Sequence, residues 1–112
     1  MTVAAELGRI VRIGSVSSIP PGEGRVFQVG LLSIAVFHSR NGGVFASEPR
    51  CPHRQGPLAD GIVGEHKVIC PLHSFVFDLS YGQPVGNDCR AIKTYPVTVS
   101  EEGQIFVDTG SL

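Results

Sequence analysis

The stretch Cys51-Pro-His53, followed after sixteen intervening residues by Cys70-Pro-Leu-His73, decides how this sequence is interpreted. Each short element carries one cysteine and one histidine, so the two elements have the same ligand content. A proline follows each cysteine directly, which fits loop backbone better than a helix. We therefore predict two metal-binding loops, whose candidate ligands are Cys51, His53, Cys70 and His73.

Two kinds of metal centre accept two cysteines and two histidines. A [2Fe–2S] cluster with two inequivalent irons takes both cysteines on one iron and both histidines on the other. Two loops at the tips of facing hairpins can supply this set, because each loop then gives one ligand to each iron. Structural zinc also accepts these residues, but zinc fingers usually place a cysteine pair before a histidine pair, on a hairpin and then a helix. Since each element here mixes the two residue types, the pattern favours the iron–sulfur cluster over zinc.

The whole chain resembles a small soluble Rieske protein, and residues 51–78 carry the cluster-binding pattern of that family. Two groups within the family are similar to it. The runs CPHRQGPLADGIVG (51–64), CPLH (70–73) and KTYPV (93–97) resemble the small subunit of the NAD(P)H-dependent assimilatory nitrite reductase. The run CRAIK (89–93) is also similar to the Rieske-type ferredoxins of bacterial ring-hydroxylating dioxygenases.

The resemblance implies an all-β fold, namely a Rieske-type antiparallel β-sandwich with an inserted cluster-binding subdomain. It implies a Rieske [2Fe–2S] cluster with Cys51 and Cys70 on the inner iron and His53 and His73 on the outer iron. The expected function is one-electron transfer, in the first place as the small subunit of an NAD(P)H nitrite reductase, which reduces nitrite to ammonium in nitrate assimilation. Such an oxidoreductase subunit is not catalytic by itself, and its partner is a large subunit that holds flavin and sirohaem.

Two other functions stay open from the sequence. The first is the Rieske ferredoxin component of a ring-hydroxylating dioxygenase system, which carries electrons from a flavin reductase to an oxygenase. The second is a non-redox assembly subunit whose site is empty or holds zinc. Cluster spectra separate the assembly subunit from both redox carriers, and co-purification with a flavin–sirohaem protein separates the two carriers from each other.

Length and charge exclude several classes of protein. With 112 residues the chain suits one domain with a small core and is too short for the large oxygenase component of a dioxygenase. A formal net charge of −1, from nine basic and ten acidic residues, does not indicate nucleic-acid binding. No segment approaches the ~18 apolar residues of a membrane span, and residues 1–10 lack the basic and apolar regions of a signal peptide. We therefore expect a cytoplasmic protein without a membrane partner, in which the third cysteine, Cys89, is a free thiol.

The resemblance also implies a low reduction potential. High-potential Rieske proteins join their two cluster loops by a disulfide, and its two positions correspond here to Gly56 and Leu72. The same proteins donate hydrogen bonds to the cluster from a serine and a tyrosine, whose positions correspond to Phe75 and Phe77. Without these donors the more negative reduced cluster is less stabilised, so we expect a potential near the low end of the family range, about −150 mV.

Glycine and proline interrupt the chain frequently, and no stretch keeps a 3.6-residue apolar period, which favours many short strands. We predict a single domain over residues 1–112, with a cluster-binding subdomain at 48–84 and a basal β-sandwich formed by 1–47 and 85–112. Asn41-Gly42 predicts a two-residue hairpin turn. The expected strands are Gly8–Ile13, Arg25–Val29, Leu31–His38, Gly43–Ser47, Val68–Cys70, Phe75–Asp78, Ala91–Ser100 and Gln104–Asp108.

Residues near the ligands have expected places as well. Four apolar residues of the two loops are expected to cover the cluster: Pro57, Leu58, Leu72 and Phe75. Arg54 and Gln55 follow the first histidine and are expected at the exposed tip, where a partner would dock. The remaining histidines, His38 and His66, stand alone in the sequence and are expected on exposed strands or turns.

Overall fold

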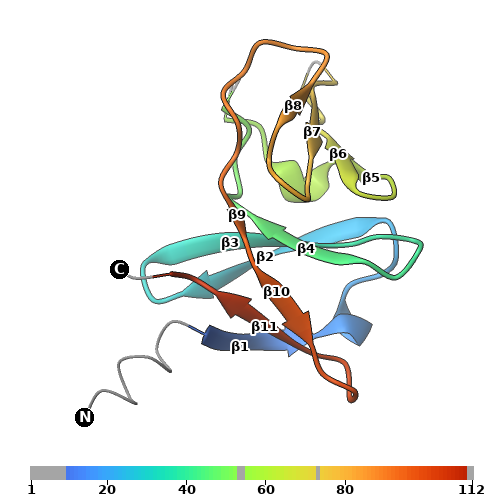
Figure 1. Ribbon diagram of the computed structural model, residues 1–112, viewed down its shortest axis with the longest axis vertical. Coiled ribbons are helices and arrows are strands. Elements are labelled where there is room, and N and C mark those ends of the chain that lie inside the picture. Colours follow the sequence, from blue (N-terminus) through green and yellow to red (C-terminus); the bar gives the residue numbers. More distant parts are fainter. Residues whose placement is uncertain (1–9, 53–54, 73, 111–112) are drawn as a thin grey trace.

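The computed structural model describes residues 10–52, 55–72 and 74–110. Within these residues the chain forms three antiparallel sheets and two short 3-10 helices, η1 (Val16–Ser18) and η2 (Leu58–Asp60) (Figure 1). No helix in this part of the chain is long and apolar enough to cross a membrane. The predicted all-β fold class is confirmed.

Two of the sheets form the base of the molecule, which occupies the lower part of Figure 1. One sheet has the order β1-β11-β10, and the other has the order β2-β3-β4-β9. Their strands are β1 (Ile10–Ser15), β2 (Glu23–Val29), β3 (Leu32–His38), β4 (Val44–Ser47), β9 (Thr94–Tyr95), β10 (Val97–Val99) and β11 (Gln104–Asp108). Alternate residues of β3 and β11, such as Ile34, Val36, Ile105 and Val107, are buried in one core cluster between the sheets. In β3 the intervening residues Ala35 and Phe37 are buried as well, in the second core cluster, so this strand is covered on both faces.

The third sheet lies above the base in Figure 1 and has the order β5-β6-β7-β8. We call it the cluster-binding sheet, and it contains β5 (Ile62–Val63), β6 (Lys67–Ile69), β7 (Val76–Asp78) and β8 (Pro84–Val85). Val68 of β6 pairs with Phe77 of β7, and both side chains are fully buried. They share a core cluster with Phe37 of β3, so the cluster-binding sheet packs directly on the base.

Close backbone contact reinforces this packing at Gly24 in β2. A Cβ atom added to Gly24 would lie 2.9 Å from Cδ1 of Phe37 and 3.1 Å from the Cα atom of Ala59 in η2. A side chain therefore does not fit between β2 and η2, and the glycine lets the two segments approach.

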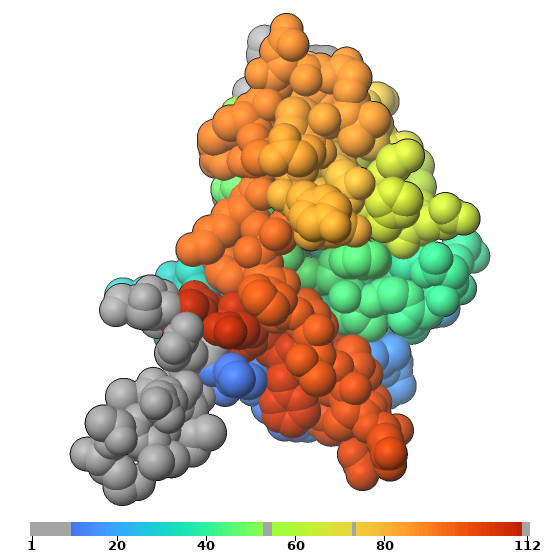
Figure 2. Space-filling view, viewed as in Figure 1, coloured from blue at the N-terminus to red at the C-terminus, as the bar shows by residue number. Residues whose placement is uncertain are grey.

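The chain passes between the base and the cluster-binding sheet at one junction. It leaves the base after Ser47 and rejoins it at Thr94, because these two residues are paired between β4 and β9. The segment between β8 and β9, residues 86–93, is called the return segment below. Figure 2 shows it in orange, running down the front of the molecule from the top to the base. Val85, where a return to the base was expected, pairs instead with Val76 in the cluster-binding sheet.

Several expected strands are confirmed with ends shifted by one or two residues, and the strand expected at Gly8–Ile13 begins outside the described residues. The expected strand Ala91–Ser100 is wrong as one element. β9 pairs with β4 in one sheet and β10 pairs with β11 in the other, so the chain changes sheets at Pro96. Proline lacks the N–H group that a continuous ladder needs. The hairpin at Asn41-Gly42 is confirmed, but its loop spans residues 39–43.

Candidate metal centre

The two cysteines of the predicted ligand set come together in the structure. Cys51 begins the loop that follows β4, and Cys70 follows β6 directly. Their exposed fractions are 0% and 1%, and both belong to the core cluster that joins the cluster-binding sheet to the base. Burial raises the pKa of the Cys70 thiol; a hydrogen bond from the Leu72 amide opposes this rise, and a hydrogen bond with the Cys51 thiol adds to it. The two thiols are thus neighbours in a site that excludes water.

The two loops are built alike at the backbone. The N–H group of Cys51 donates to the carbonyl oxygen of Gly56 at 2.8 Å, and that of Cys70 donates to the carbonyl oxygen of Phe75 at 2.7 Å. In each loop the cysteine therefore bonds the residue five positions later. Each loop folds back on its cysteine in the same way, which agrees with the equal ligand content of the two sequence elements.

A second common feature is a left-handed residue four positions after each cysteine. Gln55 has a φ of 60° and Ser74 a φ of 58°, and they are the two non-glycine residues with positive φ among those the structure describes. Such a conformation is unfavourable for residues with a side chain, and it persists where surrounding contacts hold it. Both are exposed; Gln55 lies two positions after the predicted ligand His53, and Ser74 lies one position after His73. Each loop therefore contains a non-glycine residue in the left-handed conformation that glycine usually adopts.

Gly56 is the place where the first loop touches the second. A Cβ atom at this position would lie 2.8 Å from Sγ of Cys70 and 3.2 Å from Cγ and Cδ1 of Leu72. Gly56 and Leu72 hold the positions of the loop-joining disulfide in high-potential Rieske proteins, and here they are in van der Waals reach of each other. The side chain of Leu72 thus lies close to the backbone of Gly56, at the place where those proteins have a covalent bond between the loops.

The residues expected to cover the cluster occupy different depths. Leu58 is fully buried in the core below the loops, and Phe75 packs against the same core cluster. Pro57 and Leu72 are exposed, and 40% of Leu72 is accessible to solvent. The two apolar side chains at the surface are therefore contributed one by each loop.

The predicted ligands His53 and His73, and Arg54 at the predicted tip, lie outside the described residues. Among residues 10–52, 55–72 and 74–110, no three histidine, cysteine, aspartate or glutamate side chains are grouped as metal ligands. His66 lies between β5 and β6, faces the carboxylate of Asp78 at 3.6 Å and is half-buried. His38 is half-buried, and its Nδ1 atom lies 2.7 Å from the carbonyl oxygen of Ile19, so it has a structural role in β3.

Sequence reasoning did not find that Cys89 belongs to this region. This residue of the return segment is half-buried and packs against the core cluster that contains Cys51 and Cys70. Nothing in the sequence indicates the contact, because Cys89 lies 38 positions after Cys51 and 19 positions after Cys70. The return segment therefore forms a third side of the site, beside the two loops.

Comparison with known proteins identifies the class of this fold and site. The protein-family model described as the Rieske-like [2Fe–2S] domain matches residues 9–108 of this chain. The chain belongs to this family; it is a Rieske-type electron carrier, and its cofactor is a [2Fe–2S] cluster. The buried thiol pair fits the cysteine-bound iron of such a cluster.

Individual relatives are ferredoxins and a reductase subunit. The ferredoxin component of the p-cumate 2,3-dioxygenase system of Pseudomonas putida is 33% identical over 103 residues, covering 88% of this chain and 86% of that protein. The ferredoxin of Sphingomonas yanoikuyae B1 superposes with a TM-score of 0.76 at 30% identity, covering 89% and 98% of the two chains. A Mycobacterium tuberculosis structure described as an NADH-dependent nitrite reductase small subunit gives a TM-score of 0.79 at 24% identity, covering 88% and 92%, which shows a shared fold.

Proposed function

We propose that this chain carries single electrons on a Rieske cluster bound by Cys51, His53, Cys70 and His73. The observation that supports this ligand set is the meeting of two buried cysteines at the starts of two loops with the same backbone hydrogen bond. Each cysteine is followed within three residues by a histidine. Two-loop ligation of two irons requires one cysteine and one histidine from each loop, which is the content of these two elements.

When bound, the cluster supplies one-electron transfer, and the surrounding residues set its potential. Cys51 and Cys70 hold their sulfur atoms out of water at the inner end. Phe77 is fully buried and Phe75 packs against the core, and neither side chain has a hydroxyl group to donate to sulfur. These surroundings support the expected potential near about −150 mV.

Substitution of single cysteines tests the ligand set, and the chain offers its own control. Cys70→Ser should lose the cluster, whereas Cys89→Ser should retain a full complement of iron. His73→Cys should alter the magnetic resonance spectrum of the reduced cluster. An unchanged iron content and spectrum in Cys70→Ser would contradict the assignment.

The partner that we propose first is the flavin reductase and oxygenase pair of a ring-hydroxylating dioxygenase system. Support comes from the p-cumate dioxygenase ferredoxin, which is 33% identical over nearly the whole of both chains. In such a system the carrier exchanges partners in turn, so the complexes should be weak and sensitive to salt.

The second candidate is the small subunit of an NAD(P)H nitrite reductase, beside a large subunit with flavin and sirohaem. The runs at 51–64 and 93–97 favour it, and the fold of the Mycobacterium tuberculosis subunit is compatible with it. A long-lived complex is expected in this case. Co-purification from native cells distinguishes the candidates: a stable flavin–sirohaem partner supports the nitrite reductase, and electron transfer to an oxygenase without a stable complex supports the ferredoxin.

In either case we propose that the partner docks at the tip of the two loops. Gln55, Pro57, Leu72 and Ser74 are exposed there, which gives a small apolar patch with a polar rim. Charge reversal at Arg54, next to the predicted ligand His53, should slow electron transfer at low salt while leaving the cluster spectrum unchanged. The cytoplasmic location expected from the sequence stays a prediction.

A further inference from the structure

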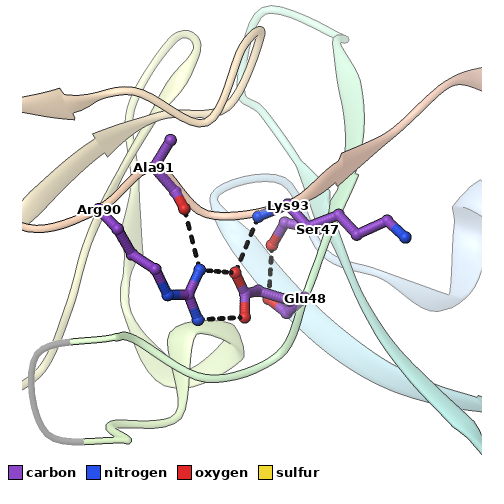
Figure 3. A network of polar contacts seen from close by, with 5 residues as sticks. All are labelled: Ser47, Glu48, Arg90, Ala91 and Lys93. Atoms are coloured by element: carbon purple, nitrogen blue, oxygen red, sulfur yellow. Dashed lines mark hydrogen bonds and ion pairs between the residues drawn. The ribbon is translucent and has the colours of Figure 1, made fainter.

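A compact network of polar contacts ties the two chain connections of the cluster-binding sheet together, and Glu48 is its centre (Figure 3). The guanidinium group of Arg90 donates to both carboxylate oxygens of Glu48, at 2.8 and 3.1 Å. The backbone N–H of Lys93 donates to Oε1 of the same carboxylate at 2.8 Å. The N–H of Glu48 in turn donates to the carbonyl oxygen of Lys93 at 2.8 Å. One side chain therefore fastens the outgoing chain to the return segment.

The network is more than an exposed surface contact. The Glu48 side chain is only 21% exposed, although 60% of the Arg90 side chain is accessible. The hydrogen bond from Arg90 is the main cause of the lowered pKa of Glu48, so the carboxylate is charged at neutral pH. Two-point contact between a guanidinium and a carboxylate fixes direction as well as distance. The return segment is thus held in one orientation relative to β4.

A second set of contacts holds the other side of the same segment. The side-chain oxygen of Asn87 accepts a hydrogen bond from the N–H of Cys89 at 2.9 Å. The amide nitrogen of Asn87 donates to the carbonyl oxygens of Val76 and Val85, at 3.2 and 3.4 Å. Cys89 therefore lies between two fixed residues: Asn87, which bonds the cluster-binding sheet, and Arg90, which bonds Glu48 after β4. These two sets of contacts are called the two anchors below.

The two anchors hold Cys89 in place beside the predicted ligands Cys51 and Cys70. Cys89 packs against the core cluster that contains Cys51 and Cys70. Burial raises the pKa of the Cys89 thiol, and the nearby Cys51 thiol adds to this rise. Glu48 itself lies three residues before Cys51, so the same ion pair also borders the first ligand loop.

We propose that Glu48 is a positioning residue of the cluster site. It acts through Arg90 and through the Lys93 amide, which keep the return segment packed against the two buried cysteines. The proposal rests on the ligand set given above, because the segment matters to the cluster only if Cys51 and Cys70 bind it. Release of the segment would admit water to the sulfur end of the cluster, where solvent exposure is one of the factors that set the potential.

The test compares the midpoint potentials of Glu48→Gln and Arg90→Gln in the cluster-loaded protein. Charge alone predicts shifts of opposite sign, because one change removes a negative charge and the other a positive charge. Positioning predicts that both variants shift to more positive potential, since both release the same segment and water stabilises the more negative reduced cluster. The double variant should shift no further than the larger single variant, because the two residues act as one unit.

Three further variants complete the experiment. Arg90→Lys keeps the charge without the two-point contact and should give an intermediate shift. Glu23→Gln breaks a similar ion pair with Arg25 at 3.1 Å on β2 and should leave the potential unchanged. Iron release to a chelator should be up to roughly fivefold faster in Glu48→Gln than in wild type, the scale of a partly exposed ion pair.

The result that would overturn the proposal is a loaded Glu48→Gln protein with wild-type potential, spectrum and iron release, even if it melts at a lower temperature. Shifts of opposite sign in Glu48→Gln and Arg90→Gln would equally overturn it, because they would reduce the effect to charge. Retention of the cluster in Cys70→Ser would instead overturn the ligand set. The two failures are therefore distinguishable.

Discussion

The contact between Gly56 and Cys70 makes the replacement of Gly56 by alanine a sharp test of how tightly the two loops are packed. The added Cβ atom would lie 2.8 Å from Sγ of Cys70, whereas non-bonded heavy atoms pack best at roughly 3.5–4.0 Å. The sulfur, or the backbone that carries it, must therefore move by about 1 Å. Two carbon atoms of Leu72 at 3.2 Å limit escape on the other side.

The expected free-energy cost of Gly56→Ala depends on whether the alanine strains the backbone or overpacks the core. Gly56 is not among the residues with positive φ, so alanine adds no backbone strain there and the cost is one of overpacking. Overpacking a well-packed core by one methyl-sized group costs about 1–3 kcal/mol. Because Cys70 is a predicted ligand, part of this cost falls on cluster binding, and about 1.4 kcal/mol corresponds to a tenfold change in an equilibrium constant.

Gly64→Ala is the matched control, since its added Cβ atom would meet a single atom within 4 Å, the carbonyl oxygen of Lys67 at 3.8 Å. We expect Gly56→Ala to lose iron to a chelator about tenfold faster than Gly64→Ala, with a changed visible spectrum. Iron content, spectrum and unfolding midpoint are measured for both variants under the same conditions. Equal iron retention and equal spectra in the two variants would refute the packing argument, because the sulfur would then have room to spare.

Three further predictions test other parts of the structure. The potential should fall as the pH rises into the alkaline range, because an imidazole bound to ferric iron loses its second proton more easily and we propose His53 and His73 as the ligands of one iron; voltammetry that is flat to strongly alkaline pH would contradict this. Gly24→Ala should lower the free energy of unfolding by about 1–3 kcal/mol, because its Cβ atom would approach the backbone of η2; urea denaturation equal to that of Gly64→Ala would show that η2 can move away. The lowered pKa of Glu48 adds stability that is present above the ordinary carboxyl value of 4.5 and is lost as the pH falls through the lowered value. The stability difference between wild type and Glu48→Gln should thus be seen at neutral pH and vanish in acid, and a difference that persists in strong acid would assign it to something other than the carboxylate.

The sequence predicted the family and the main strands because the relevant signals are local. Two cysteine–histidine elements with a proline after each cysteine indicate the family and predict the two cluster loops. Alternation of buried and partly exposed residues identifies β11, a short apolar run identifies β3, and Asn41-Gly42 identifies the hairpin that joins β3 and β4. Each of these features needs only the neighbouring residues to form, so each is visible within a short window of sequence.

Features that depend on distant partners were missed or placed differently. β8 has two residues, and it is a strand because Val85 and Pro84 pair with β7 rather than because of their own preference. The division of residues 91–100 into two strands depends on which sheet lies on each side of Pro96. The left-handed backbone at Gln55 and Ser74 is likewise imposed by the loops that contain them, since neither residue type favours it.

The most informative miss is the junction around Glu48, because it changes which residues count as parts of the site. The expected cluster-binding subdomain ends at residue 84, which would assign the return segment to the base. Cys89 would then be a thiol without a relation to the cluster site. The contacts of Asn87 and Arg90 hold the segment where Cys89 packs against the core cluster that contains the predicted ligands Cys51 and Cys70. The predicted cluster site is then bordered by three stretches of chain, of which only two carry predicted ligands. The third stretch has no metal-binding signature, and the side chains that hold it are an ordinary amide and an ordinary ion pair. The sequence pattern therefore predicts the ligands of the iron, while the residues that we propose to shield the cluster are found from the contacts of the folded chain.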